Sequence, residues 1–547
     1  MKIRFGLKTI VRDLSVSLIM AALLIAPVYG QQTATAPNST TLSATEREAE
    51  SKLNVDTIRT ITSDLAKPDM EGRGTGLLGG QKAAKYLADY FAKLGLQPLG
   101  DNKTFLQAIQ FTGTTVMPDS SLKAGNASLK FGEDYVLAPP LPDKKVDFKA
   151  PLVFITYGVV SPDLKRDDLA NLDLKGKIVV LISGQPKNVD QAAWQKAANP
   201  QATLGNLLSK GISGLIITNV GSAQQPFSLI SNYLTRRQVS VANAIRPNIP
   251  PRLLVSDAGA EKLFAGSGMT YAQAKEKAEA GETVSRDLGQ TLSGTLNIKT
   301  DEGTGSNVVG VLEGSDPNLK DQALVYSAHY DAYGIDAAGR IFPGAADNAL
   351  GVGEMAAIAE VFTKMSKKPR RSVIFLAVTG EEHGLYGSEH WAHNPTWPIG
   401  KVVADLNFDG IGSEVYGPVK QIVGYGAEFS DLGKTLDSVV AAEGDKIIPD
   451  PVPDEGVFYR SDHFSFVKQG VPSLMLLGGP DGDTAMWVAK ARKWLATDYH
   501  SPADVVRPDW VWAGSKDIAD IGLIVGMRVA DADAAPAWLP NSPFKRP

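Results

Sequence analysis

The chain has 547 residues, and its 55 lysine and arginine residues against 60 aspartate and glutamate residues give a net charge of −5. This length predicts two folded units, and 43% apolar with 21% charged residues is typical of a globular protein. The small net charge gives no indication of nucleic-acid binding. Because the chain contains no cysteine, disulfides are excluded, and any metal site must use histidine and carboxylate ligands.

The N-terminal segment has the composition of a targeting sequence. Basic residues precede an apolar stretch that runs from Leu14 to Val28. Residues 1–30 therefore predict a secretory signal peptide, and we expect a protein exported to a bacterial periplasm or to the extracellular medium. The apolar stretch is too short to favour a membrane span, so no stable membrane insertion is expected after cleavage. Residues 31–46, rich in Thr, Ser, Ala and Gln, predict a disordered linker.

Residues 47–140 have helical periodicity and predict the N-terminal part of the main domain. An amphipathic helix is expected to begin near Val55, and a second helix over 79–96 places its apolar side chains on one face. A turn-rich and proline-rich stretch over 118–150 marks a domain boundary. Beyond it, residues 141–295 carry β-branched runs on both sides of a helix, which predicts a smaller inserted β/α domain.

Residues 296–540 repeat a strand, a loop and a helix, and they predict the main domain. Several of the strands are apolar on both faces, as strands buried between helices are; they are expected within 307–314, 323–331, 372–382, 401–409 and 471–479. Residues 348–365 predict a crossover helix with an apolar stripe. This alternation predicts the α/β class, with a mostly parallel twisted sheet flanked by helices.

Side chains that can bind metal follow the ends of these predicted strands. In open sheets of this class, ligands bind beyond the carboxyl ends of the strands, so we expect these side chains at one rim of the sheet. The strand ends, the start of the crossover helix and a downstream turn supply His329, Asp331, Asp347, Glu381, Glu382, Asp409 and His500.

The neighbouring carboxylates of Glu381 and Glu382 follow an apolar strand, where they need a cation or a proton to be tolerable. Histidine and carboxylate ligands suit zinc, and two zinc ions that share one carboxylate suit hydrolysis. One glutamate of the pair is then expected to hold metal, and the other to act as general base. The sequence thus predicts two Zn²⁺ per chain, with Co²⁺ or Mn²⁺ as substitutes because their ligand preferences overlap.

Six motifs of the chain resemble the signature set of the family-28 metallopeptidases, the co-catalytic dizinc aminopeptidases of the MH clan. In chain order they are HYDAYG, GAADNALG, TGEEHGLYGS, LNFDGIG, RSDHFSF and DYHSP, and the resemblance covers residues 50–115 and 300–530. It implies a zinc-dependent aminopeptidase whose substrates are peptides with a free N-terminus. The metal ligands that it implies are His329, Asp347, Glu382, Asp409 and His500.

The resemblance also implies roles for residues that do not bind metal. Glu381 matches the general base, and Asp331 matches the carboxylate that orients a ligand histidine, a partner that metal-bound imidazoles usually need. Tyr459 is our candidate for the tyrosine that stabilises the oxyanion, while Asp462 and His463 are expected to shape the site. The segment 150–290 resembles a protease-associated (PA) domain, which implies a PA-like insert.

Three alternative functions stay open at this point. A glutaminyl-cyclase-type acyl transferase resembles the same fold with one zinc. A carboxypeptidase or dipeptidase of the same clan needs a basic residue for the substrate carboxylate, a role that Arg460 is placed to fill. A non-catalytic, receptor-like binding protein shares the two-domain plan, although such relatives typically have degraded ligand motifs.

Overall fold

The computed structural model describes residues 38–222, 226–242, 249–410, 412–480 and 482–545. The predicted signal peptide, residues 1–30, lies outside these residues, as does the first part of the predicted linker. The end of that linker is ordered, because helix α1 (Ala44–Lys52) begins with a capping box between Ser43 and Glu46. Glu46 also forms a buried ion pair of 2.8 Å with Arg528. The prediction of disorder up to residue 46 is therefore wrong at its C-terminal end.

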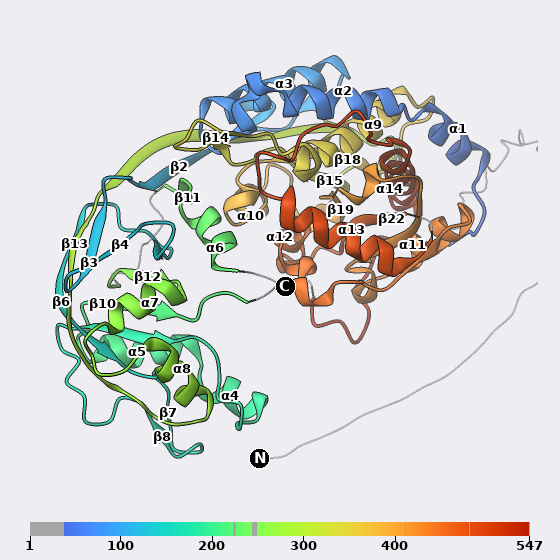
Figure 1. The fold of residues 1–547 in the computed structure, drawn as a ribbon. Coiled ribbons are helices and arrows are strands. Elements are labelled where there is room, and N and C mark those ends of the chain that lie inside the picture. Colours follow the sequence, from blue (N-terminus) through green and yellow to red (C-terminus); the bar gives the residue numbers. More distant parts are fainter. Residues whose placement is uncertain (1–37, 223–225, 243–248, 411, 481, 546–547) are drawn as a thin grey trace, which may run out of the picture. The chain divides into compact units, whose positions relative to one another are not determined.

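The main domain is built on a sheet whose central strands are parallel (Figure 1). In spatial order its strands are β11 (Gln238–Val241), β2 (Leu106–Val116), β14 (Ile298–Leu312), β18 (Ser372–Val378), β15 (Ala323–His329), β19 (Val402–Phe408), β22 (Ser473–Pro480), β20 (Val419–Tyr425) and β21 (Lys446–Ile447), and β1 (Gln97–Pro98) pairs with β14. Strands β18, β15, β19 and β22 run parallel, whereas β14 and β20 flank them antiparallel. The α/β class is confirmed, but the sheet is mixed: the strands beyond β18, which are β14, β2, β11 and β1, pair antiparallel, while the edge strand β21 pairs parallel with β20.

Helices cover both faces of this sheet. Leu324 and Tyr326 of β15 belong to one hydrophobic core and Val325 to another, as expected when side chains alternate along a strand. The first core is formed with α2 (Val55–Ala66), α3 (Leu78–Lys93), α9 (Leu350–Lys364), α11 (Leu432–Ala442) and α14 (Ala513–Asp531), and the second with α10 (Tyr386–His393) and α12 (His463–Lys468). Helix α9 lies within the predicted crossover helix, and α2 begins at the predicted residue.

A second sheet of eight strands forms the insert. Its spatial order is β4 (Ala127–Leu129), β3 (Ser121–Ala124), β13 (Arg286–Leu296), β6 (Val146–Phe154), β9 (Ile178–Ile182), β10 (Gly214–Thr218), β12 (Arg252–Val255) and β5 (Tyr135–Leu137). Its helices are α4 (Gln191–Ala197), α5 (Pro200–Ser209), α6 (Phe227–Leu234), α7 (Asp257–Phe264) and α8 (Tyr271–Glu279). The sheet thus begins at Ser121, not near residue 141, because β3 pairs with the distant strand β13.

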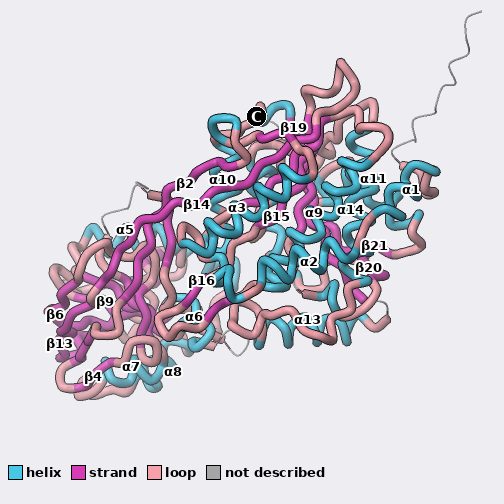
Figure 2. The backbone as a smooth tube through the Cα atoms, turned by 90° about the horizontal axis from the view of Figure 1, so that it is seen from above, coloured by secondary structure: helices cyan, strands magenta, loops and turns pink. Residues whose placement is uncertain are grey.

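The two sheets share long and returning strands. Strand β14 follows β13 almost directly and pairs with β2 along the length of β2, and Figure 2 shows these two strands running side by side. Strand β11 lies in sequence between β10 and β12 of the insert, yet it pairs with β2 of the main sheet. Among the described helices, none is both long and apolar enough to cross a membrane.

Candidate metal centre

Neighbouring parallel strands of the main sheet end at the same rim. Strand β15 ends at His329, and Asp409 follows the last residue of β19. The turn after β18 carries Glu381 and Glu382. Because parallel strands point the same way, their carboxyl ends meet, and side chains far apart in sequence come together there.

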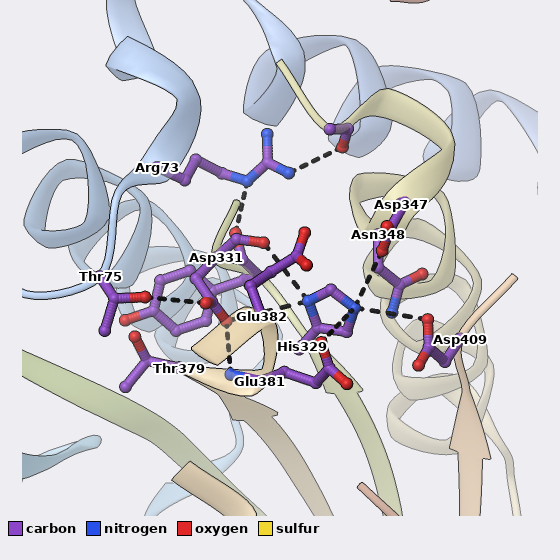
Figure 3. Close-up of polar contacts among 12 residues, drawn as sticks. Arg73, Thr75, His329, Asp331, Asp347, Asn348, Thr379, Glu381, Glu382 and Asp409 are labelled. Atoms are coloured by element: carbon purple, nitrogen blue, oxygen red, sulfur yellow. Dashed lines mark hydrogen bonds and ion pairs between the residues drawn. The ribbon is translucent and has the colours of Figure 1, made fainter. Parts of the chain in front are cut away.

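Two groups of potential metal ligands lie at this rim, and most of their members are drawn in Figure 3. In the first group, Asp347 Oδ1 and Asp409 Oδ1 lie 3.2 and 3.3 Å from His329 Nε2. In the second group, Asp347 Oδ2 and Glu382 Oε2 lie 3.3 and 2.9 Å from His500 Nε2. Within each group the ligand atoms all lie within 4.8 Å of one another. The structure thus brings the five predicted ligands together, with Asp347 shared by both groups.

Buried polar atoms at the rim fit metal ions. His329 Nε2 and Asp347 Oδ2 are buried and, although they lie 3.2–3.3 Å from the ion-pair neighbours named above, they form no hydrogen bond of good geometry among the described residues. The two side chains are 1% and 6% exposed. Such atoms are costly to bury unless a partner satisfies them, and a divalent cation in each group would do so. Three carboxylates with two imidazoles form a donor set that suits zinc.

The electrostatics of the rim also favour added positive charge. Burial by itself lowers the pKa of His500, yet Glu382 and Asp347 raise it to about 9. Burial likewise opposes protonation of His329, but the carboxylates of Glu381 and Asp409 raise its pKa well above the usual range. Protons on the imidazoles therefore compensate the carboxylates when no cation is bound, and metal binding would displace those protons.

Glu381 lies beside the ligand groups but belongs to neither. Its Oε2 atom is 3.8 Å from His329 Nε2, and its backbone N–H donates to Asp331 Oδ1 at 3.2 Å. Burial raises the pKa of Glu381 well above its usual range, although the His329 imidazolium opposes this. Glu381 therefore has an enhanced affinity for a proton and lies next to the candidate ligands.

Asp331 lies behind the imidazole of His329. Its carboxylate Oδ1 is 3.8 Å from His329 Nδ1, and its backbone carbonyl oxygen is 3.3 Å from the same nitrogen. The hydroxyl of Thr75 donates to Asp331 Oδ2 at 2.8 Å. Asp331 thus holds the ring nitrogen that faces away from the first ligand group, with Thr75 fixing the carboxylate.

Two supporting residues escaped the sequence interpretation. Asp504 accepts hydrogen bonds from the backbone N–H groups of Ala346 and Asp347, at 2.9 and 3.0 Å. Ser461 donates to Asp409 Oδ2 at 2.5 Å. Ser461 lies inside the motif RSDHFSF, and Asp504 lies just after the motif DYHSP. Their closeness to these motifs was the sequence feature that could have indicated a role at the site.

Arg73 is a third residue that sequence reasoning missed. Its guanidinium is buried and donates to the backbone carbonyl oxygens of Tyr330, Pro343 and Gly344. Figure 3 draws Arg73 beside the candidate ligands. One side chain thus ties the segment after β15 to the turn that carries the shared aspartate. Nothing in the glycine-rich sequence around Arg73 indicates locally that this charge is buried.

A cavity of about 1600 Å³ opens onto the ligand groups. Tyr459 and Arg460 lie in its wall. The Tyr459 side chain is 59% exposed, and its described ring contacts are with Phe458 and Phe464, not with a ligand residue. The cavity exceeds the usual size of a small-molecule pocket and has room for more than a single amino-acid residue.

Comparison with known proteins finds a family match for one segment of the chain. Residues 307–522 match the model of peptidase family M28, which confirms the resemblance seen in the motifs. The solved aminopeptidase from Aneurinibacillus sp. strain AM-1 aligns with a TM-score of 0.61 and 19% identity, over 90% of this chain and 97% of that chain. At this identity the likeness shows the fold. The matched segment begins after the insert, whose protease-associated type stays a prediction.

Curated relatives match shorter segments. A probable zinc metalloprotease of Pyricularia oryzae is 40% identical over 20% of this chain. A probable glutamate carboxypeptidase of Arthroderma benhamiae is 28% identical over 32% of the chain, and a vacuolar membrane protease of Clavispora lusitaniae is 32% identical over 20% of it. The chain spans 21%, 24% and 10% of the lengths of these relatives. The predicted bacterial periplasmic or extracellular location is wrong, since these relatives are fungal and one is named for the vacuolar membrane.

Proposed function

We propose that this chain, whose residues 307–522 belong to peptidase family M28, is a zinc-dependent aminopeptidase that hydrolyses the first peptide bond of peptides with a free N-terminus. One observation carries the proposal: Asp347 is shared by two ligand groups, each completed by a histidine and a second carboxylate. Glu381 lies beside them without belonging to either. This arrangement supports two metal ions and a separate base.

The ligand assignment follows the two groups. His329 and Asp409 would hold one zinc ion, Glu382 and His500 the other, and Asp347 would bridge them. When bound, zinc would lower the pKa of a water molecule to near neutrality and polarise the scissile carbonyl group. Cobalt or manganese would fit the same ligand types.

The remaining chemistry belongs to side chains of the protein. Glu381 takes the proton of the attacking water, and its raised pKa suits it to pass that proton to the leaving amine. Asp331 keeps the imidazole of His329 in one orientation. From the cavity wall, the Tyr459 hydroxyl donates a hydrogen bond to the carbonyl oxygen of the scissile bond, which becomes negatively charged during the reaction.

Replacing Tyr459 by Phe removes this hydrogen bond. The variant should then have a kcat lower by roughly 10²- to 10³-fold, measured at saturating substrate.

A carboxypeptidase or dipeptidase of the same clan is the second candidate. Arg460 lies in the cavity wall, where its guanidinium is suited to bind a substrate carboxylate, and one relative is named a probable glutamate carboxypeptidase. A glutaminyl-cyclase-type acyl transferase is less well supported, because two ligand groups exceed what one zinc ion needs. A receptor-like role is less well supported because both groups are complete.

A paired peptide panel separates these functions. Each peptide is offered with a free and with an N-acetylated amine, with and without a zinc chelator, and released amino acids are measured. Chelator-sensitive cleavage of the free-amine members alone is the expected result. Cleavage of both members, with release of the C-terminal residue, would show a carboxypeptidase. No cleavage by zinc-loaded protein would contradict a peptidase function.

A further inference from the structure

One segment of the insert leaves its own sheet and reaches the metal centre. Helix α6 and strand β11 together cover residues 227–241, and β11 pairs antiparallel with β2, with Gln238 opposite Thr114 and Val241 opposite Phe111. Two consecutive arginines, Arg236 and Arg237, connect the helix to the strand. Scattered basic residues usually belong to a solvated face, but these two point toward the rim.

Arg236 contacts the loop that carries His500. Its Nη2 atom donates to the backbone carbonyl oxygen of His500 at 2.6 Å. Its guanidinium lies 4.4 Å from the ring centres of both Tyr333 and Phe342. The hydroxyl of Tyr333 is in turn 3.1 Å from His500 Nδ1. Arg236 therefore holds the backbone of this histidine directly, and through Tyr333 it supports the ring.

Arg237 reaches the opposite ligand group through two further residues. It pairs with Asp301, with Nη2 to Oδ1 at 2.6 Å, and its Nη1 donates to the backbone carbonyl oxygen of Thr75 at 3.0 Å. Thr75 donates to Asp331, which lies behind His329. A side chain at Gly113 would strike the Arg237 guanidinium, since its Cβ would lie 2.0 Å from Nε.

These contacts are specific to arginine. A buried charge is costly unless hydrogen bonds and opposite charges compensate it. The planar guanidinium can donate in plane while it lies against aromatic rings, which a lysine ammonium cannot do. Two adjacent part-buried arginines that each serve a different ligand histidine are thus a costly arrangement for a domain that merely covers a cleft.

We propose that the insert positions both histidine ligands through this arginine pair: Arg236 fixes His500, and Arg237 fixes His329 by way of Thr75 and Asp331. The inference rests on the proposed zinc function and adds to it a role for the insert. Arg236 and Arg237 act as positioning residues, and the metal centre is complete only when the 227–241 segment is seated against β2.

Zinc titration of the metal-free, full-length protein tests this pairing. The two binding events are first assigned with His500→Ala and His329→Ala, each of which should lose one event. Arg236→Met should weaken, by about 10-fold or more, the event that His500→Ala loses. Arg237→Met should do the same to the event that His329→Ala loses. The matched control is Arg286→Met, since Arg286 Nη2 also donates to a carbonyl, that of Ser267 at 2.7 Å, but within the insert.

The outcomes separate the two proposals. If Arg236→Met binds zinc in both events with affinities within twofold of those of the unaltered protein, the positioning role is overturned. The positioning role would also be overturned if Arg286→Met weakened both zinc-binding events as much as the Arg236 and Arg237 variants do, because the effect would then be a general one. If Arg236→Met does not fold, Arg236→Lys is titrated in its place and should still weaken the His500 event. No zinc binding by the unaltered protein would overturn the proposed function and, with it, this inference.

Discussion

The two ligand groups of the metal centre are held in different ways. His329 ends strand β15, and its side chain is 1% exposed. His500 follows helix α13 (Thr484–Thr497) in a turn, its side chain is 23% exposed, and its φ angle of 53° is uncommon for a residue with a side chain. The backbone of His329 is thus held by the sheet, whereas the backbone and ring of His500 depend on contacts from Arg236 and Tyr333.

This difference indicates which parts of the site are preorganised. A strand end buried in a sheet keeps its position through many ladder hydrogen bonds, whereas a strained turn depends on a few side-chain partners. We expect the first group to bind zinc more tightly, and the second to respond more strongly to changes in its surroundings. Each of the following experiments separates the two groups or removes what they share.

Replacing the shared aspartate should have the largest effect. Asp347→Ala removes a ligand from both groups, so the zinc content of both groups should fall. Loss of a residue that merely supports a ligand costs up to roughly 100-fold in activity, so loss of this shared ligand should lower kcat/KM by more than that. Metal analysis after dialysis and a peptidase assay measure this. Retention of two zinc ions with full activity would contradict the bridging assignment.

The neighbouring glutamates should separate chemistry from metal binding. Glu381→Gln should lower kcat by roughly 10²- to 10⁴-fold through loss of the base while both zinc ions stay bound. The matched variant Glu382→Gln should lose zinc from the second group alone. Full activity of Glu381→Gln would refute the proposed mechanism.

Asp331→Asn should affect the first group alone. Loss of the negative charge behind His329 should weaken the zinc affinity of that group by roughly 10- to 100-fold, measured by competition with a chromogenic chelator. Thr75 and Glu381 both retain a partner in this variant, because the amide oxygen can still accept from the Glu381 backbone N–H while the amide NH2 group donates to the Thr75 hydroxyl oxygen. A weaker second group with an unchanged first group would reverse the assignment.

The smallest effect should be a pH dependence of the metal-free protein. Although burial lowers it, the pKa of His500 is raised by Glu382 and Asp347 from 6.5 to about 9. A raised pKa stabilises the fold fully below the unfolded-state value, and this stability is lost as pH rises through the folded value. The free energy of unfolding should fall by at most about 3 kcal/mol between pH 6.5 and 9.

Urea unfolding in the presence of a chelator measures this trend, and His500→Asn is the control. The variant lacks the titrating imidazole, so its stability should change less over the same pH window. An unfolding free energy that rises with pH in the unaltered protein would contradict the assigned direction.

Local signals predicted much of the main domain. The apolar periodicity of residues 348–365 predicted α9, and the strand predicted within 323–331 corresponds to β15. Both predictions were possible because side-chain direction repeats every 3.6 residues in a helix and every 2 residues in a strand. The start of the insert was missed because β3 is short and finds its partner in the distant strand β13. Asp504 and Arg73 were missed because neither belongs to a periodic pattern, and their partners are backbone groups.

By itself, the sequence determined the α/β class, the five candidate ligands and the adjacent Glu381, because periodicity and motif spacing are local properties of the chain. The tertiary structure decided that one aspartate faces both groups, that the insert begins at Ser121, and that Arg236 and Arg237 support the two histidines. These features depend on contacts between residues far apart in the chain, and such contacts exist only once the sheets have formed and buried those residues together.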